Sequence, residues 1–398
     1  MTRTLTVLGA TGSIGQQTLD VVCRYPDEFD VLALTASRGS DVLASLCIEF
    51  NPSYAVVGSQ QESNQLRSRL NGKAKSTKIL VDNDEVEDSR VYNADVVVTS
   101  IVGAAGLNPT LKAIENGNTV LITNKEPVVM LGPMLRDEVR KHKTTIVPVD
   151  SEHNAIFQCC SSKSGARYEC FSPIDGLRRI LLTGSGGPFR TIDLNRLQAV
   201  TPEQAVAHPV WNMGPKISVD SATMMNKGLE IIEARWLFET PADQIQIVVH
   251  PQGIVHSMVE YIDGSVLAQM GTPDMRVPLT FGLFWPRRGE SGSQQLDLFE
   301  MSAMSFEPPD FIRFPCLKLA AEVARCEGTA PAVMNAANEI AVEAFLESRI
   351  QFTDIHTVVA HCVDDMGNDD CESIPQVIEI DRKARNIAQK KVFQLSTG

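Results

Sequence analysis

The stretch Thr4-Leu-Thr-Val-Leu-Gly9-Ala-Thr11-Gly12-Ser13-Ile14-Gly15 decides the fold predicted for this chain. Its first half is an apolar run typical of a buried strand, and a helix is expected from Gln16 to Arg24. Glycines at this spacing allow a tight turn and close backbone approach, and the amino terminus of the following helix favours a pyrophosphate. The turn lies directly between a strand and a helix. It therefore predicts a dinucleotide-binding domain in preference to a glycine-rich turn without a ligand.

Short apolar, β-branched runs continue beyond this turn, with helical patterns between several of them. Alternation of this kind indicates an α/β domain with a Rossmann-like, doubly wound and mostly parallel sheet. Ligands of such a sheet gather at the carboxyl ends of its strands. The expected strands cover residues 31–36, 54–57, 78–81, 95–99, 119–123 and 145–149.

The residues after the second expected strand favour NADP over NAD. An NAD enzyme usually carries an acidic residue there to bind the ribose 2′-hydroxyl. This chain has Ser37-Arg38-Gly39-Ser40 instead, which offers hydroxyls and a cation to a 2′-phosphate. The alternative is that Arg38 is an exposed loop cation.

Carboxylates at one strand end predict a metal site. Asp150 and Glu152 follow the last expected strand, and in an extended segment their side chains would point to the same face. Two such acids repel each other unless a cation or proton lies between them. The alternative is a solvated loop or a helix cap. Glu230 supplies a third carboxylate at the start of an expected helix, where capping is its alternative role. An all-oxygen set suits Mg²⁺ or Mn²⁺, with Co²⁺ also compatible.

The middle of the chain carries groups that suit a phosphorylated ligand. Ser185 lies in a glycine-rich turn whose backbone N–H groups can bind an anion, although a plain tight turn fits equally well. Ser221, Asn226 and Lys227 precede the expected helix at residues 231–238 and could grip a phosphate. His208-Pro-Val-Trp211 lies in a loop that is a candidate lid, with local packing of the tryptophan as the alternative.

Composition narrows the classes of partner and location. The chain of 398 residues carries 36 basic and 49 acidic side chains, a net charge of −13, which argues against nucleic acid and anionic membranes as partners. No apolar run approaches the ~20 residues that span a bilayer. The nine cysteines contain no C-x-x-C pair, and residues 1–7 enter a strand at once. We therefore expect reduced thiols and a cytoplasmic protein.

Together these motifs resemble the 1-deoxy-D-xylulose 5-phosphate reductoisomerase family. The similar blocks keep their order over nearly the whole chain. They are Gly9–Gly15, Asn124-Lys125-Glu126, residues 149–158, 182–190, 208–214 and 218–230, Asp274-Met275-Arg276, and Asn335-Ala-Ala-Asn338-Glu339. The resemblance implies an enzyme that rearranges a small phosphorylated sugar and reduces the product with NADPH. It also implies a homodimer.

The resemblance further assigns roles by position. It implies catalytic roles for Lys125, Asp150, Glu152, His208 and Glu230, and metal ligation by Asp150, Glu152 and Glu230. The implied substrate contacts are Lys125, Ser151, Glu152, Ser185, His208, Trp211, Ser221, Asn226, Lys227 and Glu230. The implied cofactor contacts are Thr11, Gly12, Ser13, Ile14, Ser37, Arg38, Gly39, Asn124, Glu126, Gly214 and Met275. Two departures from the family pattern are Ser37-Arg38-Gly39 and Pro127.

The expected organisation has four segments. They are a cofactor-binding domain at residues 1–150, an α+β central catalytic domain at 151–285, a linker at 286–312 and an α-helical bundle at 313–398. Two other functions are compatible with the first domain. A phosphorylating semialdehyde dehydrogenase would need an activated cysteine nucleophile. A non-catalytic NADP-binding sensor would have no need of three acids.

Overall fold

The chain folds into two compact units. The computed structural model describes residues 2–82, 89–161, 167–211, 213–301 and 303–397. The first unit comprises Met1–Asn124, Asp137–Asn154 and Asp274–Gln294. The second comprises Lys125–Arg136, Ala155–Pro273 and Gln295–Gly398.

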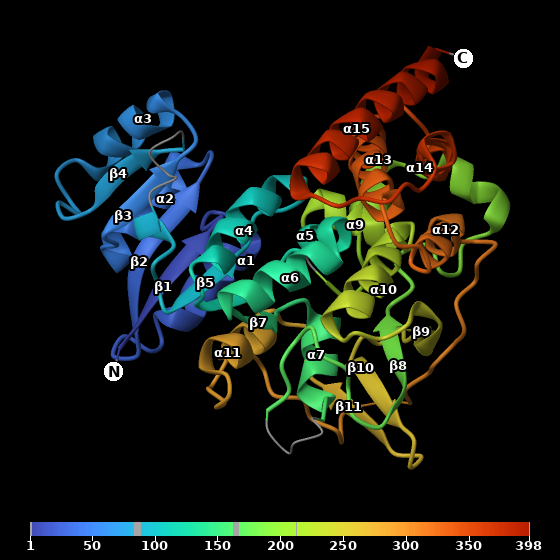
Figure 1. The fold of residues 1–398 in the computed structure, drawn as a ribbon, viewed down its shortest axis with the longest axis horizontal. Coiled ribbons are helices and arrows are strands. Elements are labelled where there is room, and N and C mark those ends of the chain that lie inside the picture. Colours follow the sequence, from blue (N-terminus) through green and yellow to red (C-terminus); the bar gives the residue numbers. More distant parts are fainter. Residues whose placement is uncertain (1, 83–88, 162–166, 212, 302, 398) are drawn as a thin grey trace. The chain divides into compact units, whose positions relative to one another are not determined.

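The first unit is built on a seven-stranded sheet (Figure 1). All neighbouring strands are parallel, in the order β4-β3-β2-β1-β5-β6-β7. The order reverses direction at β1, which places the turn after β1 at the topological switch point, where ligands of such sheets bind. This confirms the predicted Rossmann-like α/β fold. The strands are β1 (Arg3–Leu8), β2 (Phe29–Ala36), β3 (Tyr54–Val57), β4 (Lys78–Val81), β5 (Val96–Thr99), β6 (Thr119–Ile122) and β7 (Thr145–Pro148).

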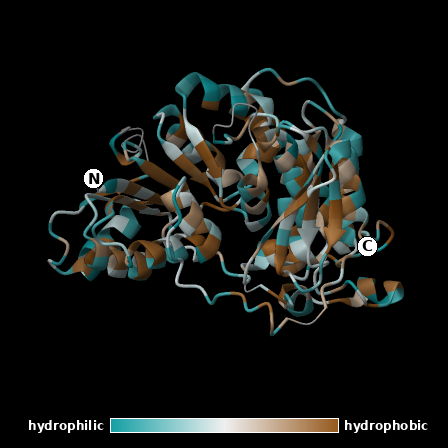
Figure 2. Cartoon of the chain, turned by 90° about the horizontal axis from the view of Figure 1, so that it is seen from below, coloured by the Kyte–Doolittle hydropathy of each residue, from teal (hydrophilic) through white to brown (hydrophobic). Residues whose placement is uncertain are grey.

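Helices connect these strands. The central strands are buried over most of their length, as their apolar β-branched residues predict, and they are coloured hydrophobic in Figure 2. Helix α11 returns from later in the chain to pack against α1. The helices are α1 (Ser13–Val22), α2 (Ser40–Phe50), α3 (Gln60–Leu70), α4 (Leu107–Glu115), α6 (Pro133–His142) and α11 (Arg276–Phe284), with short 3₁₀ turns η1 (Ser89–Val91) and η2 (Ala104–Gly106).

The glycine turn joins β1 to α1 as predicted. Gly9 has a φ of 80°, and a Cβ there would lie 2.6 Å from the carbonyl oxygen of Ser100. A Cβ on Gly15 would lie 2.4 Å from the carbonyl oxygen of Gly9. Only glycine fits at these two positions, because side chains there would strike the backbone.

The second unit contains a smaller mixed sheet covered by helices. Its strand order is β11-β10-β8-β9, with β8 and β9 parallel and the other pairs antiparallel. The strands are β8 (Leu177–Gly184), β9 (Ile245–Val249), β10 (Val255–Tyr261) and β11 (Val266–Met270). The helices before and between them are α5 (Glu126–Leu131), α7 (Ser151–Cys159, which begins in the first unit), η3 (Leu194–Ala199), α8 (Pro202–Val206), α9 (Pro215–Ala222), α10 (Met225–Leu237) and η4 (Ala242–Gln244).

Helices form the end of the chain, as predicted. Helix α13 is almost entirely buried and packs against α5, α9, α14 and α15. Residues 303–312 attach to the small sheet through a bridge between Val249 and Glu307. The four-segment division of the chain remains a prediction. The helices are α12 (Pro315–Val323), α13 (Ala330–Leu346), α14 (Asp354–Met366) and α15 (Ile374–Thr397).

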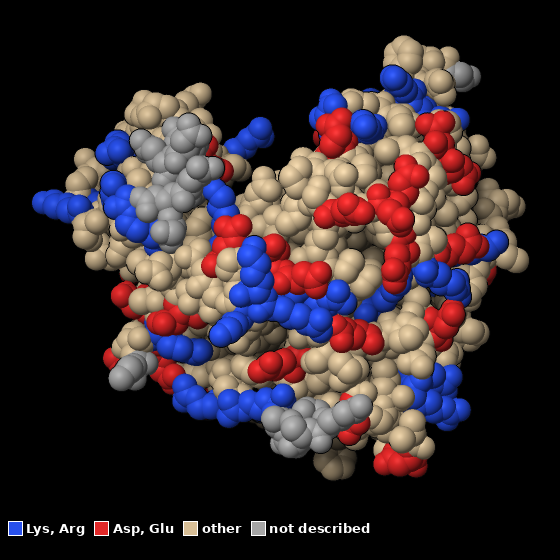
Figure 3. Space-filling view, in the orientation of Figure 1, with Lys and Arg blue, Asp and Glu red and all other residues tan. Residues whose placement is uncertain are grey.

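The surface carries both signs of charge. On the face drawn in Figure 3, acidic and basic side chains lie interspersed. Among the described residues, none of the helices is both long and apolar enough to cross a bilayer.

The glycine turn yields a test of the fold. We expect Gly15→Ala to lower the free energy of unfolding by about 1–3 kcal/mol, because its Cβ must displace backbone. Gly12→Ala is the matched control, since a Cβ there would lie 3.3 Å from its nearest neighbour. Urea denaturation without cofactor measures both. Equal losses for the two variants would contradict this description of the turn.

Candidate active site

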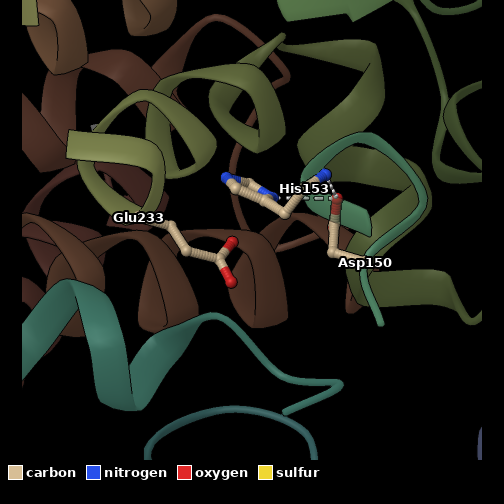
Figure 4. Close-up of side chains that lie close together, drawn as sticks. All are labelled: Asp150, His153 and Glu233. Carbon is tan, nitrogen blue, oxygen red and sulfur yellow. Dashed lines mark hydrogen bonds and ion pairs between the residues drawn. The ribbon is translucent and has the colours of Figure 1, made fainter. Parts of the chain in front are cut away.

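In the first unit, Asp150 caps helix α7. Its Oδ1 accepts hydrogen bonds from the backbone N–H of Glu152 at 3.2 Å and from the Nδ1 of His153 at 3.1 Å (Figure 4). Such bonds favour the ionised carboxylate. The Ser151 hydroxyl lies beside the other acid and donates to its Oε2 at 2.7 Å. A ligand oxygen of Asp150 and one of Glu152 lie within 4.8 Å of each other.

The predicted extended segment at these acids is wrong. The two carboxylates do lie close together, but the chain leaves β7 at Pro148 and enters a helix at Ser151. The chain forms a helix here and does not continue as a strand, because the aspartate side chain accepts hydrogen bonds from N–H groups that have no partner within the first turn of the helix. Asp150 therefore caps a helix, as the alternative interpretation predicted, and it also lies close to Glu152.

The cofactor positions of the first unit gather at the carboxyl ends of its strands. The backbone N–H groups of Gly9 and Ala10 donate to the carbonyl of Thr35 at 3.1 and 2.8 Å, which fixes the glycine turn beside the end of β2. A Cβ on Gly39 would lie 3.6 Å from Thr11. The predicted groups at 11–14 and 37–39 are therefore neighbours.

Asn124 and Met275 complete this set. Asn124 follows β6 and is 6 % exposed, and its Nδ2 makes no hydrogen bond within the described part of the chain. A buried amide donor without a partner is costly and suits a ligand contact. Met275 caps α11, which an ion pair of 3.3 Å between Arg276 and Asp20 joins to α1.

In the second unit, a fully buried carboxylate is surrounded by donors. Glu230 is 0 % exposed. Its Oε1 accepts a hydrogen bond from the Nζ of Lys125 at 2.9 Å and another from the Nδ2 of Asn226, and its Oε2 pairs with Lys227 at 2.5 Å. Lys125 also donates to the Oδ1 of Asn226 at 2.9 Å. Two ammonium groups thus compensate one buried acid, as burial of charge requires.

The helix carrying these groups begins earlier than expected. Met224 adopts a left-handed conformation, with φ of 56°, and separates α9 from α10. Ser221 therefore lies in α9, and Asn226 and Lys227 lie in the first turn of α10 instead of before it. Glu230 is on the second turn, so its role is contact with Lys125 and Lys227 rather than capping.

The proposed phosphate contacts meet around the end of β8. A Cβ on Gly184 would lie 2.9 Å from the Cδ of Lys227, so the lysine stem runs across this glycine. A Cβ on Gly187 would lie 2.5 Å from the carbonyl oxygen of Ser221. The Ser185 hydroxyl lies in the same turn and accepts from the N–H of Gly187 at 3.2 Å.

His208 is held as a neutral imidazole. Its Nδ1 accepts from the backbone N–H groups of Val210 and Trp211 at 3.2 and 2.8 Å, so the proton resides on Nε2. That Nε2 lies 3.0 Å from the hydroxyl of Ser185 and can donate to it. Burial, with a smaller contribution from Lys227, lowers the pKa of His208 to about 4. His208 therefore holds the loop on the Ser185 turn.

Two other histidines of this unit, His250 and His256, have structural partners. The His256 ring lies 6.0 Å from that of Trp211, and burial lowers the pKa of His256 to about 4. The Nδ1 of His250 lies 2.9 Å from the carbonyl oxygen of Ser305, and its ring stacks on Phe306. His250 thereby anchors the segment at 303–312.

One residue of the candidate site, Lys216, was missed from the sequence, although its partner Glu126 was a predicted cofactor contact. The carboxylate of Glu126 is buried and pairs with Lys216 at 3.0 Å. Burial alone would raise the pKa of Glu126, but Lys216 lowers it below its ordinary value. Gly214, a predicted cofactor contact, caps the helix on which Lys216 lies. The only sequence signal was the motif Asn335-x-x-Asn338-Glu339, whose purpose spacing does not disclose.

Five of the nine cysteines lack the features of a nucleophile. Burial raises the pKa of Cys47 and of Cys316 to about 12, and that of Cys362 to about 11. Burial also raises the pKa of Cys160 and Cys170. A catalytic thiol needs a lowered pKa, so none of these five supports the dehydrogenase alternative.

The state of His208 predicts a pH dependence of stability. The unfolded imidazole takes up a proton near pH 6.5, whereas the native one resists protonation until about pH 4. Stability is therefore lost as the pH falls through this window, because the unfolded state binds more protons there. In urea denaturation at several pH values, His208→Gln should lose stability less steeply than the parent. Parallel curves would contradict the assignment.

Comparison with known proteins identifies the family. The model described as 1-deoxy-D-xylulose 5-phosphate reductoisomerase matches residues 5–132, and those of two C-terminal domains of this enzyme match 146–238 and 270–387. A reductoisomerase of this name from Nitrosomonas europaea is 50% identical, over 98% of this chain and 94% of the relative. One from Tolumonas auensis is also 50% identical, over 98% and 99% of the two chains.

Comparison with solved structures identifies the same family. The reductoisomerase from Zymomonas mobilis in complex with NADPH has a TM-score of 0.89 and 46% identity, covering 98% of this chain and 99% of that one. A DOX-P reductoisomerase in complex with NADPH, fosmidomycin and magnesium has a TM-score of 0.92 and 40% identity, with both chains fully covered. This chain therefore belongs to the 1-deoxy-D-xylulose 5-phosphate reductoisomerase family.

Proposed function

We propose that this chain converts 1-deoxy-D-xylulose 5-phosphate into 2-C-methyl-D-erythritol 4-phosphate, using NADPH and a divalent cation. The reaction cleaves and rejoins a carbon–carbon bond and then reduces the resulting aldehyde, within the non-mevalonate route to isoprenoid precursors. The observation that carries this conclusion is the identity of about half of all residues to enzymes of this name over nearly the full chain. A non-catalytic sensor is not supported, because the chain carries three acids, Asp150, Glu152 and Glu230, for which a sensor would have no need.

The first unit fits NADPH. Its glycine turn lies at the switch point of the sheet, beside Ser37 and Arg38, which suit a 2′-phosphate. The buried amide of Asn124 offers a donor, and Met275 offers an apolar surface for the nicotinamide. NADPH supplies the hydride for the reduction. Thr11, Gly12, Ser13, Ile14 and Gly39 would position it.

The acids fit a hard divalent cation. We assign Asp150, Glu152 and Glu230 as its ligands, because an all-carboxylate set matches the preference of Mg²⁺ and Mn²⁺ for oxygen. Such an ion supplies Lewis acidity and a template for the substrate oxygens. The bonds to Asp150 from the backbone and from His153 orient its carboxylate. Ser151 and Lys125 would then contact the sugar oxygens.

A second ligand set competes with this assignment. Asp150, His153 and Glu233, drawn in Figure 4, also combine ligand types that bind metals. That set contains an imidazole, which suits Zn²⁺ and other transition metals better than Mg²⁺. We therefore favour the set with Glu230.

The second unit supplies the substrate's anion site. Ser185, Ser221, Asn226 and Lys227 would bind the phosphate, which suits three short polar donors and one ammonium group. The loop from His208 to Gly214 would close over the sugar, with Trp211 excluding water. Because His208 is neutral, we assign it to loop closure and hydrogen bonding rather than to acid catalysis as a cation.

We further propose that the enzyme is a homodimer. The family resemblance implies this state, and the outer edge of the small sheet supports it. Val266 and Leu267 of the edge strand β11 are 48 % and 49 % exposed, and Ile262 in the turn before it is 76 % exposed. Exposed apolar residues on an edge strand favour pairing with a second chain. Sedimentation velocity at micromolar concentration should show a dimer, and a monomer alone would refute it.

A cytoplasmic location is also proposed. All nine cysteines are free, including the neighbours Cys159 and Cys160. Thiols of this number persist in a reducing compartment. Cell fractionation with an antibody to this chain would test the location, and recovery outside the cytoplasm would overturn it.

The function is tested by following NADPH absorbance with 1-deoxy-D-xylulose 5-phosphate. We expect consumption that requires Mg²⁺ or Mn²⁺ and stops with a chelator. Glu230→Gln should lower turnover by on the order of a hundredfold or more while NADPH affinity stays near the parent value. Glu233→Gln is the matched control, since Glu233 is a second buried acid on the same helix. Absence of metal-dependent consumption would refute the function, and a selective loss in Glu233→Gln would favour the other ligand set.

A further inference from the structure

A buried polar cluster in the second unit joins three helices that are distant in sequence. Lys216 on α9 pairs with Glu126 of α5 at 3.0 Å and with Asp220 of its own helix at 2.9 Å. Asn338 of α13 donates from its Nδ2 to the Oδ1 of Asp220 at 2.8 Å. The side chains of Glu126 and Asp220 are 6 % and 2 % exposed, and Asn338 is fully buried.

Stability alone does not account for this cluster. Replacing a buried ion pair by well-packed apolar side chains is often neutral or stabilising. Here two buried acids share one ammonium group, and the Oδ1 of Asn338 has no hydrogen-bond partner among the described residues. What the cluster does provide is a defined register between α5, α9 and α13, because each hydrogen bond fixes a distance and a direction.

Two members of this buried polar cluster, Glu126 and Lys216, are close in sequence to residues of the candidate site. Glu126 is the first residue of α5 and directly follows Lys125, which contacts Glu230 and Asn226. Lys216 is the second residue of α9 and follows the loop that carries His208 and Trp211. At its other end, His208 of that loop lies 3.0 Å from the hydroxyl of Ser185, and the Trp211 ring lies 6.0 Å from that of His256. Lys216 thus determines where the loop ends relative to Lys125.

We propose that Lys216, oriented by Asp220 and Asn338, is a positioning residue of the reaction: it sets the end of the His208–Gly214 loop against the Lys125–Glu126 segment. This gives a role to Asn338 of the motif Asn335-x-x-Asn338-Glu339 and makes α13 part of the support of the site. The inference rests on the proposed function, in which Lys125 binds the sugar and the loop closes over it.

Asn338→Ala tests this inference with little disturbance of the site, because Asn338 contacts neither Lys125 nor the loop through any described bond. Asn335→Ala is the matched control. Asn335 is equally buried on the same helix, but its amide donates within that helix, to Glu339 at 3.3 Å. Both variants should lose thermal stability. Only Asn338→Ala should lose catalytic efficiency per folded molecule.

We expect Asn338→Ala to lower kcat/KM for 1-deoxy-D-xylulose 5-phosphate about tenfold, since a displacement of about 1 Å in a positioned group can cost more than that. Equal kcat/KM for the two asparagine variants, after correction for folded fraction, would overturn the proposal. Inactive parent enzyme would instead refute the proposed function.

A second pair keeps the test decisive if Asn338→Ala does not fold. Lys216→Arg retains a cation for both acids, whereas Lys216→Met retains only the apolar stem. The arginine variant should keep several times more kcat/KM than the methionine variant under conditions where both are folded. Equal values for the two would contradict positioning by the ammonium group.

Discussion

The second unit depends on the compensation of buried charge around one carboxylate. Glu230 is fully buried, and its two oxygens are held by Lys125, Asn226 and Lys227. Removing both lysines would leave an unpaired charge in a low-dielectric interior, which costs several kcal/mol. The same three donors are those that a phosphorylated, hydroxylated substrate needs. A carboxylate that keeps two lysines in place therefore also prepares the binding of an anion.

Buried charges are also compensated in the cluster around Lys216, whose residues are not assigned to the substrate. Lys216 balances Glu126 and Asp220, and Asn338 orients the latter acid. Helices packed only through apolar side chains can shift with little loss, whereas hydrogen-bonded charges specify one arrangement. The loop with His208 and Trp211 is followed directly by the helix that carries this lysine. The packing of α13 is thereby connected, through Lys216, to the end of the loop that carries His208 and Trp211.

Much of the fold could be predicted because it depends on local patterns. The glycine turn and the alternating strands identify the sheet, since both signals come from residues that are close together in the sequence. The acids at 150 and 152 were correctly placed together, and they lie at a helix cap, which was the alternative interpretation, and not on a continued strand. The start of α10 was missed because Met224, an ordinary helix former, adopts a left-handed conformation there. The contact of Asp220 with Asn338 spans 118 positions, and no spacing rule reaches that far.

The ligand set of the divalent cation is the central claim, because the roles of Lys125, Lys227 and Ser151 follow from it. The most direct measurement is a crystal structure of the enzyme with Mn²⁺ and 1-deoxy-D-xylulose 5-phosphate, in which anomalous scattering locates the ion. We predict one strong peak in direct contact with oxygens of Asp150, Glu152 and Glu230, with Lys227 turned to the phosphate. A peak coordinated by His153 and Glu233 would contradict the assignment.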